Sequence, residues 1–162
     1  MNIEVGQKAP QITLQDQTGT KHSLSQYKGS WVVVYFYPKD DTPGCTIQAC
    51  DIRDGWQAFK DKKIVVLGIS PDTVESHQKF AQKHSLPFIL LADPEKEALK
   101  VYGAWREKVL FGKTFLGVVR STVLINPKGV IAKVYKRAHA KTHAKKVLKD
   151  LERLMLADSL TT

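Results

Sequence analysis

Short apolar runs alternate with helix-like patterns along the chain. The run Trp31 to Tyr37 is built of β-branched and aromatic residues, a composition that suits a strand buried on both faces of a parallel sheet. Ile64 to Ser70 is a second such run, and Pro87 to Ala92 is a shorter third. Apolar residues at helical spacing predict one helix from Cys45 to about Lys60 and another from Asp72, as cap, to about His84. This order predicts parallel strands joined by right-handed crossovers.

Two hairpins and a terminal helix are predicted around this centre. Gln11 to Ser25 has two short strand patterns separated by a polar turn, and Ser121–Ile125 and Val130–Tyr135 flank the turn sequence Asn-Pro-Lys-Gly. Apolar positions at helical spacing predict a last helix over about Ala140 to Ala157.

The segment before the second hairpin is less regular. Asp93 and Pro94 resemble the cap and first residue of a brief helix that ends near Tyr102. Periodicity then fails over 104–119, which predicts a long loop whose Trp105 and Phe111 either line a site or pack in the core. The complete order predicts an α/β, thioredoxin-like fold, with a central mixed sheet flanked by helices, an N-terminal β-hairpin extension and a single domain over 1–162.

Composition excludes several classes of protein. Of the 162 residues, 43% are apolar and 25% charged, which is typical of a globular protein. No apolar run approaches the roughly 18 residues of a spanning helix, and the first residues lack a signal-peptide core, so a cytoplasmic protein without membrane contact is expected. With two cysteines, a catalytic or metal-binding pair is favoured over a disulfide framework.

The net charge of +9 is concentrated near the C-terminus. Residues 1–127 hold 16 basic and 13 acidic residues, whereas 128–162 hold 9 and 3. This excess is either a patch for nucleic acid or another acidic partner, or the solvated face of the last helix. We favour the solvated face, because an apolar stripe lies opposite the lysines and no aromatic residues interleave with them. Nucleic acid is therefore not an expected partner.

The candidate chemistry lies just after the first buried run. Pro38 ends the strand, Thr42 is a predicted N-cap, Pro43 takes the first helical position and Cys45 the third. The first turn of a helix offers unpaired N–H groups and the positive end of the helix dipole, both of which favour a thiolate over a thiol. We therefore expect Cys45 to be a nucleophile, although a buried packing cysteine is the alternative.

Cys50 lies five residues further along the same predicted helix. Helix geometry places Cα atoms five residues apart at about 8.6 Å. A disulfide needs about 4.4 to 6.8 Å, so the two sulfurs bond only if the helix start unwinds. This arrangement is typical of a redox switch rather than a structural crosslink.

The run from Pro38 to Cys45, Pro-Lys-Asp-Asp-Thr-Pro-Gly-Cys, resembles the active-site signature of peroxiredoxins. Cys50 resembles the resolving cysteine of their bacterioferritin-comigratory, or Q-type, branch, and Arg120 stands where the family keeps its active-site arginine. The resemblance extends over nearly the whole chain. It departs at Gln48, where many relatives carry glutamate.

The resemblance implies a role for each of these residues. Cys45 attacks the peroxide, Thr42 and Arg120 bind and polarise it, and Pro38 shields the thiolate. Cys50 condenses with the sulfenic acid of Cys45, and thioredoxin or a glutaredoxin-like protein reduces the resulting disulfide. The resemblance further implies a monomer that acts on hydrogen peroxide or organic hydroperoxides, and no cofactor or metal is expected.

Two alternatives stay open. Cys45 and Cys50 could bind zinc with the suitably spaced His139 and His143. The chain could instead be a non-enzymatic, redox-sensitive binding protein that uses its basic C-terminal face. Adjacent acidic residues at 40 and 41 are interpreted as loop residues rather than a catalytic pair, and no glycine-rich phosphate-binding motif is present.

Overall fold

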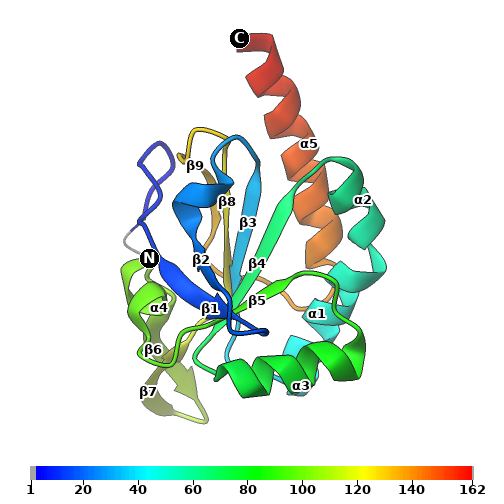
Figure 1. Cartoon of the computed structure of the whole chain (residues 1–162). Coiled ribbons are helices and arrows are strands. Elements are labelled where there is room, and N and C mark those ends of the chain that lie inside the picture. Colours follow the sequence, from blue (N-terminus) through cyan, green and yellow to red (C-terminus); the bar gives the residue numbers. More distant parts are fainter. Residues whose placement is uncertain (1–2, 162) are drawn as a thin grey trace.

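A seven-stranded mixed sheet crosses the molecule in the order β2-β1-β5-β4-β3-β8-β9 (Figure 1). Its parallel centre is formed by β3 (Val32–Phe36), β4 (Val65–Ser70) and β5 (Ile89–Ala92). Antiparallel to β3 lies β8 (Ser121–Ile125), which pairs in turn with β9 (Ile131–Tyr135). The predicted α/β class, the parallel strands and the second hairpin are confirmed.

The N-terminal hairpin extends this sheet at one edge. Its strands are β1 (Thr13–Asp16) and β2 (Lys21–Ser23), and β1 pairs antiparallel with β5. A 3₁₀ helix, η1 (Leu24–Tyr27), comes next in the chain. The Asp16 carboxylate accepts hydrogen bonds from the backbone N–H groups of Thr18 and Thr20, which fixes the turn. The predicted hairpin extension is confirmed.

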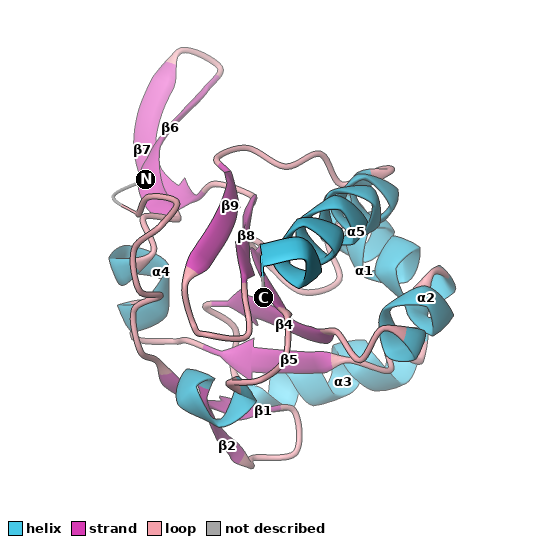
Figure 2. Cartoon of the chain, turned by 90° about the horizontal axis from the view of Figure 1, so that it is seen from above, coloured by secondary structure: helices cyan, strands magenta, loops and turns pink. Residues whose placement is uncertain are grey.

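Helices cover both faces of the sheet, as the computed structural model of residues 3–161 shows (Figure 2). On one face lie α1 (Pro43–Asp54), α2 (Trp56–Asp61), α3 (Val74–His84) and α5 (His143–Thr161). The short α4 (Glu97–Val101) lies on the other face. Each face of the sheet therefore has its own hydrophobic core.

Strand β3 contributes to both cores. Val33 and Tyr35 belong to the core under α1, α2, α3 and α5, whereas Val32, Val34 and Phe36 belong to the core on the α4 side. All five side chains are buried. Because both faces are covered, the strand shows no alternation of polar and apolar residues, as predicted.

The predicted single helix from Cys45 to Lys60 is wrong. The structure has α1 and α2, with Gly55 between them as the C-cap of the first and the N-cap of the second. Glycine is a poor helix residue, and Gly55 N–H closes the end of α1 on the carbonyl of Asp51. The apolar spacing continues across the break because Ile52 and Phe59 pack into the same core.

Two predicted helix starts are also wrong. Thr73, not Asp72, caps α3 by accepting a hydrogen bond from Ser76 N–H at 3.2 Å. The Asp72 carboxylate instead accepts from the Asp40 N–H, a distant group that sequence spacing does not reveal. Helix α4 begins after Lys96 rather than at Pro94, although the Asp93 carboxylate still accepts from its first turn.

The predicted long loop over 104–119 is wrong, because it forms a separate two-stranded hairpin. Strands β6 (Trp105–Leu110) and β7 (Lys113–Val118) project from the body beside β9 (Figure 2). Most of their side chains reach solvent, so neither strand shows the alternation that reveals a half-buried strand. Phe111 and Gly112 both have positive φ, as a tight hairpin turn requires.

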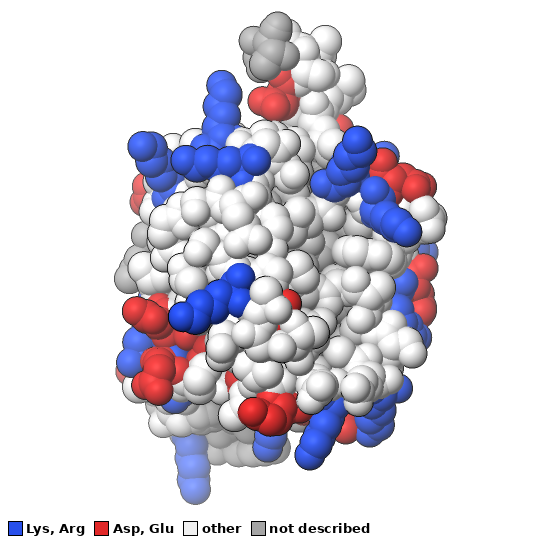
Figure 3. Space-filling model, viewed as in Figure 1, with Lys and Arg blue, Asp and Glu red and all other residues white. Residues whose placement is uncertain are grey.

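The terminal helix α5 begins and ends a few residues later than predicted. Ala144, Val147 and Leu151 are buried against the sheet and α1, while Lys145 and Lys149 on the opposite side are exposed. On the face shown in Figure 3, basic side chains are scattered rather than gathered into one patch, and acidic side chains lie beside several of them. These observations support the solvated helix face. Within residues 3–161, no helix combines the length and apolarity needed to cross a membrane.

Candidate active site

The site lies where β3 ends and α1 begins. Pro38 comes after the strand and is half-buried, Thr42 occupies the N-cap position in extended backbone, and Pro43 opens the helix. Cys45 is then in the first turn, as predicted, and its side chain is 2% exposed. The strand therefore delivers the thiol to the carboxyl edge of the sheet, where α/β proteins place their sites.

Arg120 reaches Cys45 through sheet pairing. Ser121 is paired with Phe36 at the end of β3, so Arg120, the residue before it, lies at the same edge as the start of α1. Its Nη2 donates to Cys45 Sγ at 3.4 Å. A permanently charged guanidinium at this distance stabilises a thiolate. The two residues are 75 positions apart in the chain.

Gln48 fixes the guanidinium from its other side. Arg120 Nη1 donates to Gln48 Oε1 at 2.6 Å, and Gln48 lies one helical turn after Cys45 with a side chain that is 1% exposed. Gly44 makes this approach possible, since a Cβ there would lie 3.0 Å from Arg120 Nη2. The Gln48 amide oxygen therefore serves as an acceptor for Arg120, and one turn of α1 accepts hydrogen bonds from both Nη atoms of the guanidinium.

Thr42 does not cap α1 with its side chain. Its hydroxyl donates to the carbonyl of Lys39 at 2.8 Å, so its lone pairs remain available to accept a hydrogen bond. The structure thus keeps the N-cap position that was predicted but assigns the hydroxyl to the preceding loop.

Cys50 lies on the same intact helix as Cys45. Both thiols are free, and Cys50 is half-buried. The prediction that the pair is not bridged within the folded helix is confirmed.

Lys108 is a residue near the site that the sequence did not reveal. It lines a surface hollow of about 440 Å³ together with Val109, Arg120, Arg137 and His139. Lys108 Nζ donates to the carbonyl of Val118 at 2.8 Å. Burial, and to a smaller extent the charge of Arg120, lowers the pKa of Lys108, while the charge of Cys45 opposes that shift. The register of the hairpin over 105–118, which the sequence did not predict, brings this lysine to the site.

The zinc alternative is not supported. His143 Nε2 is hydrogen-bonded to Thr122 Oγ1 at 2.9 Å, and burial, reinforced by nearby Lys146, lowers its pKa to about 4. Within residues 3–161, the side chains close enough to share a metal ion belong to Asp40, Asp72 and His77, and this group includes neither cysteine.

Comparison with known proteins shows similarity to one protein family over most of the chain. The AhpC/TSA family model matches residues 5–134. Peroxiredoxin Bcp of Bacillus subtilis is 45% identical over 152 residues, which cover 94% of this chain and 97% of that protein. A putative Bcp peroxiredoxin of Helicobacter pylori is 47% identical over 149 residues, covering 92% and 98%.

Solved structures show the same likeness. A PrxQ mutant of Xylella fastidiosa superposes with a TM-score of 0.90 at 30% identity, covering 96% of this chain and 99% of that one. The bacterioferritin comigratory protein of Xanthomonas campestris, solved in a study of its alkyl peroxide reduction, has a TM-score of 0.83 at 34% identity, covering 88% and 90%. The central sheet and flanking helices of this chain match these structures.

Proposed function

The chain belongs to the AhpC/TSA family, as a peroxiredoxin of the Bcp type, and on that premise we propose how its residues reduce a peroxide. It is a thiol peroxidase, so its reaction consumes a peroxide substrate and thiol reducing equivalents. This activity replaces the alternative hypothesis of a non-enzymatic, redox-sensitive binding protein.

Cys45 is the attacking residue in this proposal. The observation that carries it is the hydrogen bond of 3.4 Å from Arg120 Nη2 to Cys45 Sγ at the start of α1. The guanidinium and the N-terminal end of the helix both favour the thiolate, which is the nucleophilic form. Burial of the thiol keeps the sulfur from adventitious reactions until a small substrate enters.

The thiolate attacks one oxygen of the hydroperoxide, forming an S–O bond as the O–O bond breaks. The departing alkoxide or hydroxide takes up a proton and leaves as alcohol or water, and Cys45 becomes a sulfenic acid. Arg120 stabilises the charge that develops on the departing oxygen. Thr42 Oγ1, whose own hydrogen is directed to Lys39, accepts the hydrogen of the peroxide and orients it, while Pro38 restricts water.

Cys50 then resolves the sulfenic acid. Its thiol displaces water from Cys45, which gives an intramolecular disulfide between the two. Helix geometry requires α1 to unwind for this step. An external dithiol, thioredoxin or a glutaredoxin-like protein, supplies two electrons, restores both thiols and becomes a disulfide itself. The monomeric state, the cytoplasmic location and the single domain over 1–162 stay predictions.

A thiol titration tests this assignment. One equivalent of peroxide added to the reduced protein should remove both free thiols, and Cys45→Ser should abolish the reaction. Cys50→Ser should consume one equivalent and stop as sulfenic acid. The oxidised wild type should show a weaker helical circular dichroism signal than the reduced protein. Retention of full turnover with thioredoxin by Cys50→Ser would contradict the role of Cys50.

A further inference from the structure

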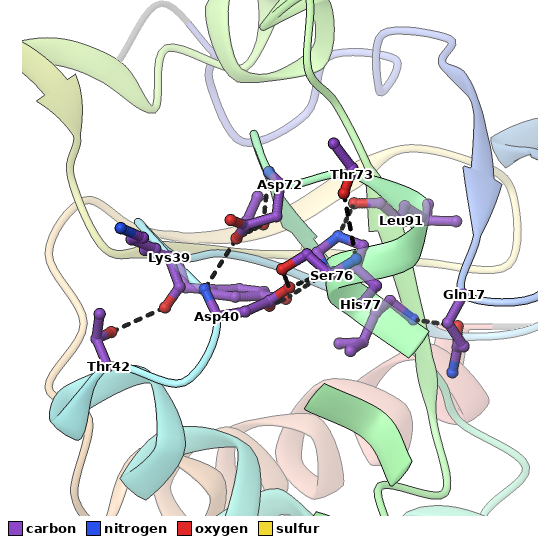
Figure 4. A network of polar contacts seen from close by, with 12 residues as sticks. Gln17, Lys39, Asp40, Thr42, Asp72, Thr73, Ser76, His77 and Leu91 are labelled. Atoms are coloured by element: carbon purple, nitrogen blue, oxygen red, sulfur yellow. Dashed lines mark hydrogen bonds and ion pairs between the residues drawn. The ribbon is translucent and has the colours of Figure 1, made fainter. Parts of the chain in front are cut away.

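A buried polar network lies under the loop that joins β3 to α1 (Figure 4). At its centre are Asp40, which is 8% exposed, and His77 on α3, which is fully buried. The proposed peroxidase reaction uses neither residue. Charged or titratable groups are seldom buried without a structural or functional reason, because removing them from water is costly.

The carboxylate of Asp40 is fully engaged. The hydroxyl of Tyr37 donates to Oδ1 at 2.6 Å, and the hydroxyl of Ser76 donates to Oδ2 at 2.8 Å. His77 Nδ1 lies 2.7 Å from the same Oδ2. Burial, with the charges of Tyr35 and Asp40 adding to it, raises the pKa of Tyr37 well above its usual range, so Tyr37 remains a donor.

The contacts of His77 define where its protons lie. Nε2 is 3.0 Å from the carbonyl oxygen of Leu91 on β5, and a carbonyl only accepts, so Nε2 carries a hydrogen. Nδ1 faces Asp40 Oδ2 at hydrogen-bond distance, which requires a second proton between these two atoms. Because Asp40 already accepts from Tyr37 and Ser76 as a carboxylate, we place that proton on Nδ1, and the pair is then an imidazolium and a carboxylate held by a charge-assisted hydrogen bond.

The backbone of the loop is tied to the same region. Asp40 N–H donates to the carboxylate of Asp72 at 2.8 Å, and Asp72 also accepts from Ser70 Oγ at the end of β4. Figure 4 shows these contacts converging on Asp40 from the start of α3 and the strand ends. The neighbouring Asp41 is exposed, so its ion pair with Lys83 and its hydrogen bond with His84 contribute little to the stability of the loop.

The network connects the start of α1, which unwinds during the proposed reaction, to a part of the protein that stays folded. The loop carries Pro38 and Thr42 and runs directly into α1, whose first turns must unwind before Cys45 and Cys50 can bond. Asp40 is held by Ser76 and His77 on α3 and by Asp72 in the connection between β4 and α3. The start of α3 has its own cap, because Thr73 Oγ1 accepts from Ser76 N–H. Asp40 is thus held by the part that stays folded, five residues before the attacking sulfur.

We propose that Asp40 and His77 form the fixed end of the segment that unwinds, and that their bond sets the balance between peroxide attack and disulfide formation. Both are positioning residues, and the inference rests on the proposed function of Cys45 and Cys50. An intact pair holds Thr42 and α1 in the geometry for attack. A broken pair frees the helix start, so attack becomes slower, resolution becomes faster, and less sulfenic acid persists to be overoxidised by excess peroxide.

Two substitutions at His77 separate the contact of Nδ1 with Asp40 from the contact of Nε2 with Leu91. The amide nitrogen of Asn in His77→Asn takes the position of Nδ1 and keeps a donor toward Asp40. The longer amide in His77→Gln takes the position of Nε2 and keeps only the bond to Leu91. Rapid-quench thiol titration would measure attack and resolution separately, and mass spectrometry would measure sulfinic acid at high peroxide.

We expect His77→Gln to shift the ratio of resolution to attack about tenfold toward resolution, the scale of one charge-assisted hydrogen bond, with less sulfinic acid. His77→Asn should stay within about threefold of wild type, because the bond to Asp40 is kept. Should His77→Gln fail to fold, Ser76→Ala removes one donor to Asp40 and should shift the ratio the same way by a smaller factor.

Leu99→Ala is the control for general loss of stability, since Leu99 is fully buried in the core on the α4 side. It should lower the unfolding midpoint without changing the ratio. Equal ratios in wild type, His77→Gln and Ser76→Ala would overturn the inference. Failure of the wild type itself to lose both thiols would instead overturn the proposed function, so the two failures are distinguishable.

Discussion

The guanidinium of Arg120 meets two acceptors on one turn of α1. Cys45 Sγ and Gln48 Oε1 lie on adjacent positions of the helix face, and Gly44 leaves room for the approach. The two hydrogen bonds act together. Because Gln48 Oε1 fixes Nη1 of the planar guanidinium, Nη2 is directed toward Cys45 Sγ. Charge alone, without this geometry, would stabilise the thiolate less.

Substitution of Arg120 tests this arrangement. Arg120→Met should lower kcat/KM for peroxide by about 10² to 10³, the usual cost of losing a donor to a developing oxyanion. Arg120→Lys should recover part of the rate, because the charge returns but the two-armed fork does not. Stopped-flow measurement of thiol loss gives both values. Equal rates for Arg120→Met and wild type would show that the guanidinium has no part in catalysis.

At the scale of elements, the hairpin of β6 and β7 is stabilised at its base rather than its tip. Val118 is 3% exposed and belongs to the core on the α4 side, and the backbone of Val119 donates to Ala104. Phe111, at the tip, is 93% exposed. The hairpin therefore holds Lys108 beside Arg120 through packing at one end only.

Paired substitutions in the hairpin should have very different effects on stability. Val118→Ala should reduce the free energy of unfolding by about 2 kcal/mol, since it removes two buried methyl groups from a packed core. Phe111→Ser should change it by less than about 0.5 kcal/mol, because its ring contacts mainly solvent. Urea denaturation measures both. A large loss from Phe111→Ser would show that the tip packs against something other than solvent.

At the scale of the whole molecule, α5 connects the central sheet to α1, the helix that carries Cys45 and Cys50. His143, in its first turn, is hydrogen-bonded to Thr122 on β8, and Ala144 N–H donates to the carboxylate of Asp51 on α1 at 3.3 Å. Farther along α5, Asp150 accepts from Lys133 and from the hydroxyl of Tyr135 on β9. Global stability therefore depends on keeping these buried contacts intact.

The pKa of about 4 for His143 predicts a pH dependence of stability. The fold favours neutral imidazole, whereas the unfolded chain takes up a proton near pH 6.5. Stability should thus be complete above about pH 6.5, decline by up to about 3 kcal/mol as the pH falls to about 4, and lose nothing further from this group below that. Urea titrations across this range measure the slope. His143→Gln should flatten this part of the curve, and an unchanged slope would contradict the assignment.

Elements whose signals are local could be predicted from the sequence. Buried strands over 31–37 and 64–70 are continuous apolar runs because both of their faces are covered, and Thr42 and Pro43 mark a helix start through their own backbone preferences. The placement of Cys45 in the first turn, and its separation from Cys50, result from helix geometry alone. The role of Arg120 in the site was predicted from the family resemblance and not from a local signal.

Features that depend on contacts between distant segments could not be predicted from the sequence. The apolar spacing predicted a helix through Gly55, but in the structure Gly55 separates α1 from α2. The sequence predicted Asp72 as a helix cap, but its carboxylate accepts from the Asp40 N–H instead. An exposed hairpin leaves no periodic pattern, and so Lys108 could not be placed. The roles of Gln48 and His77 depend on partners 72 and 37 positions away, and a buried polar side chain takes its role from such partners rather than from its neighbours in sequence.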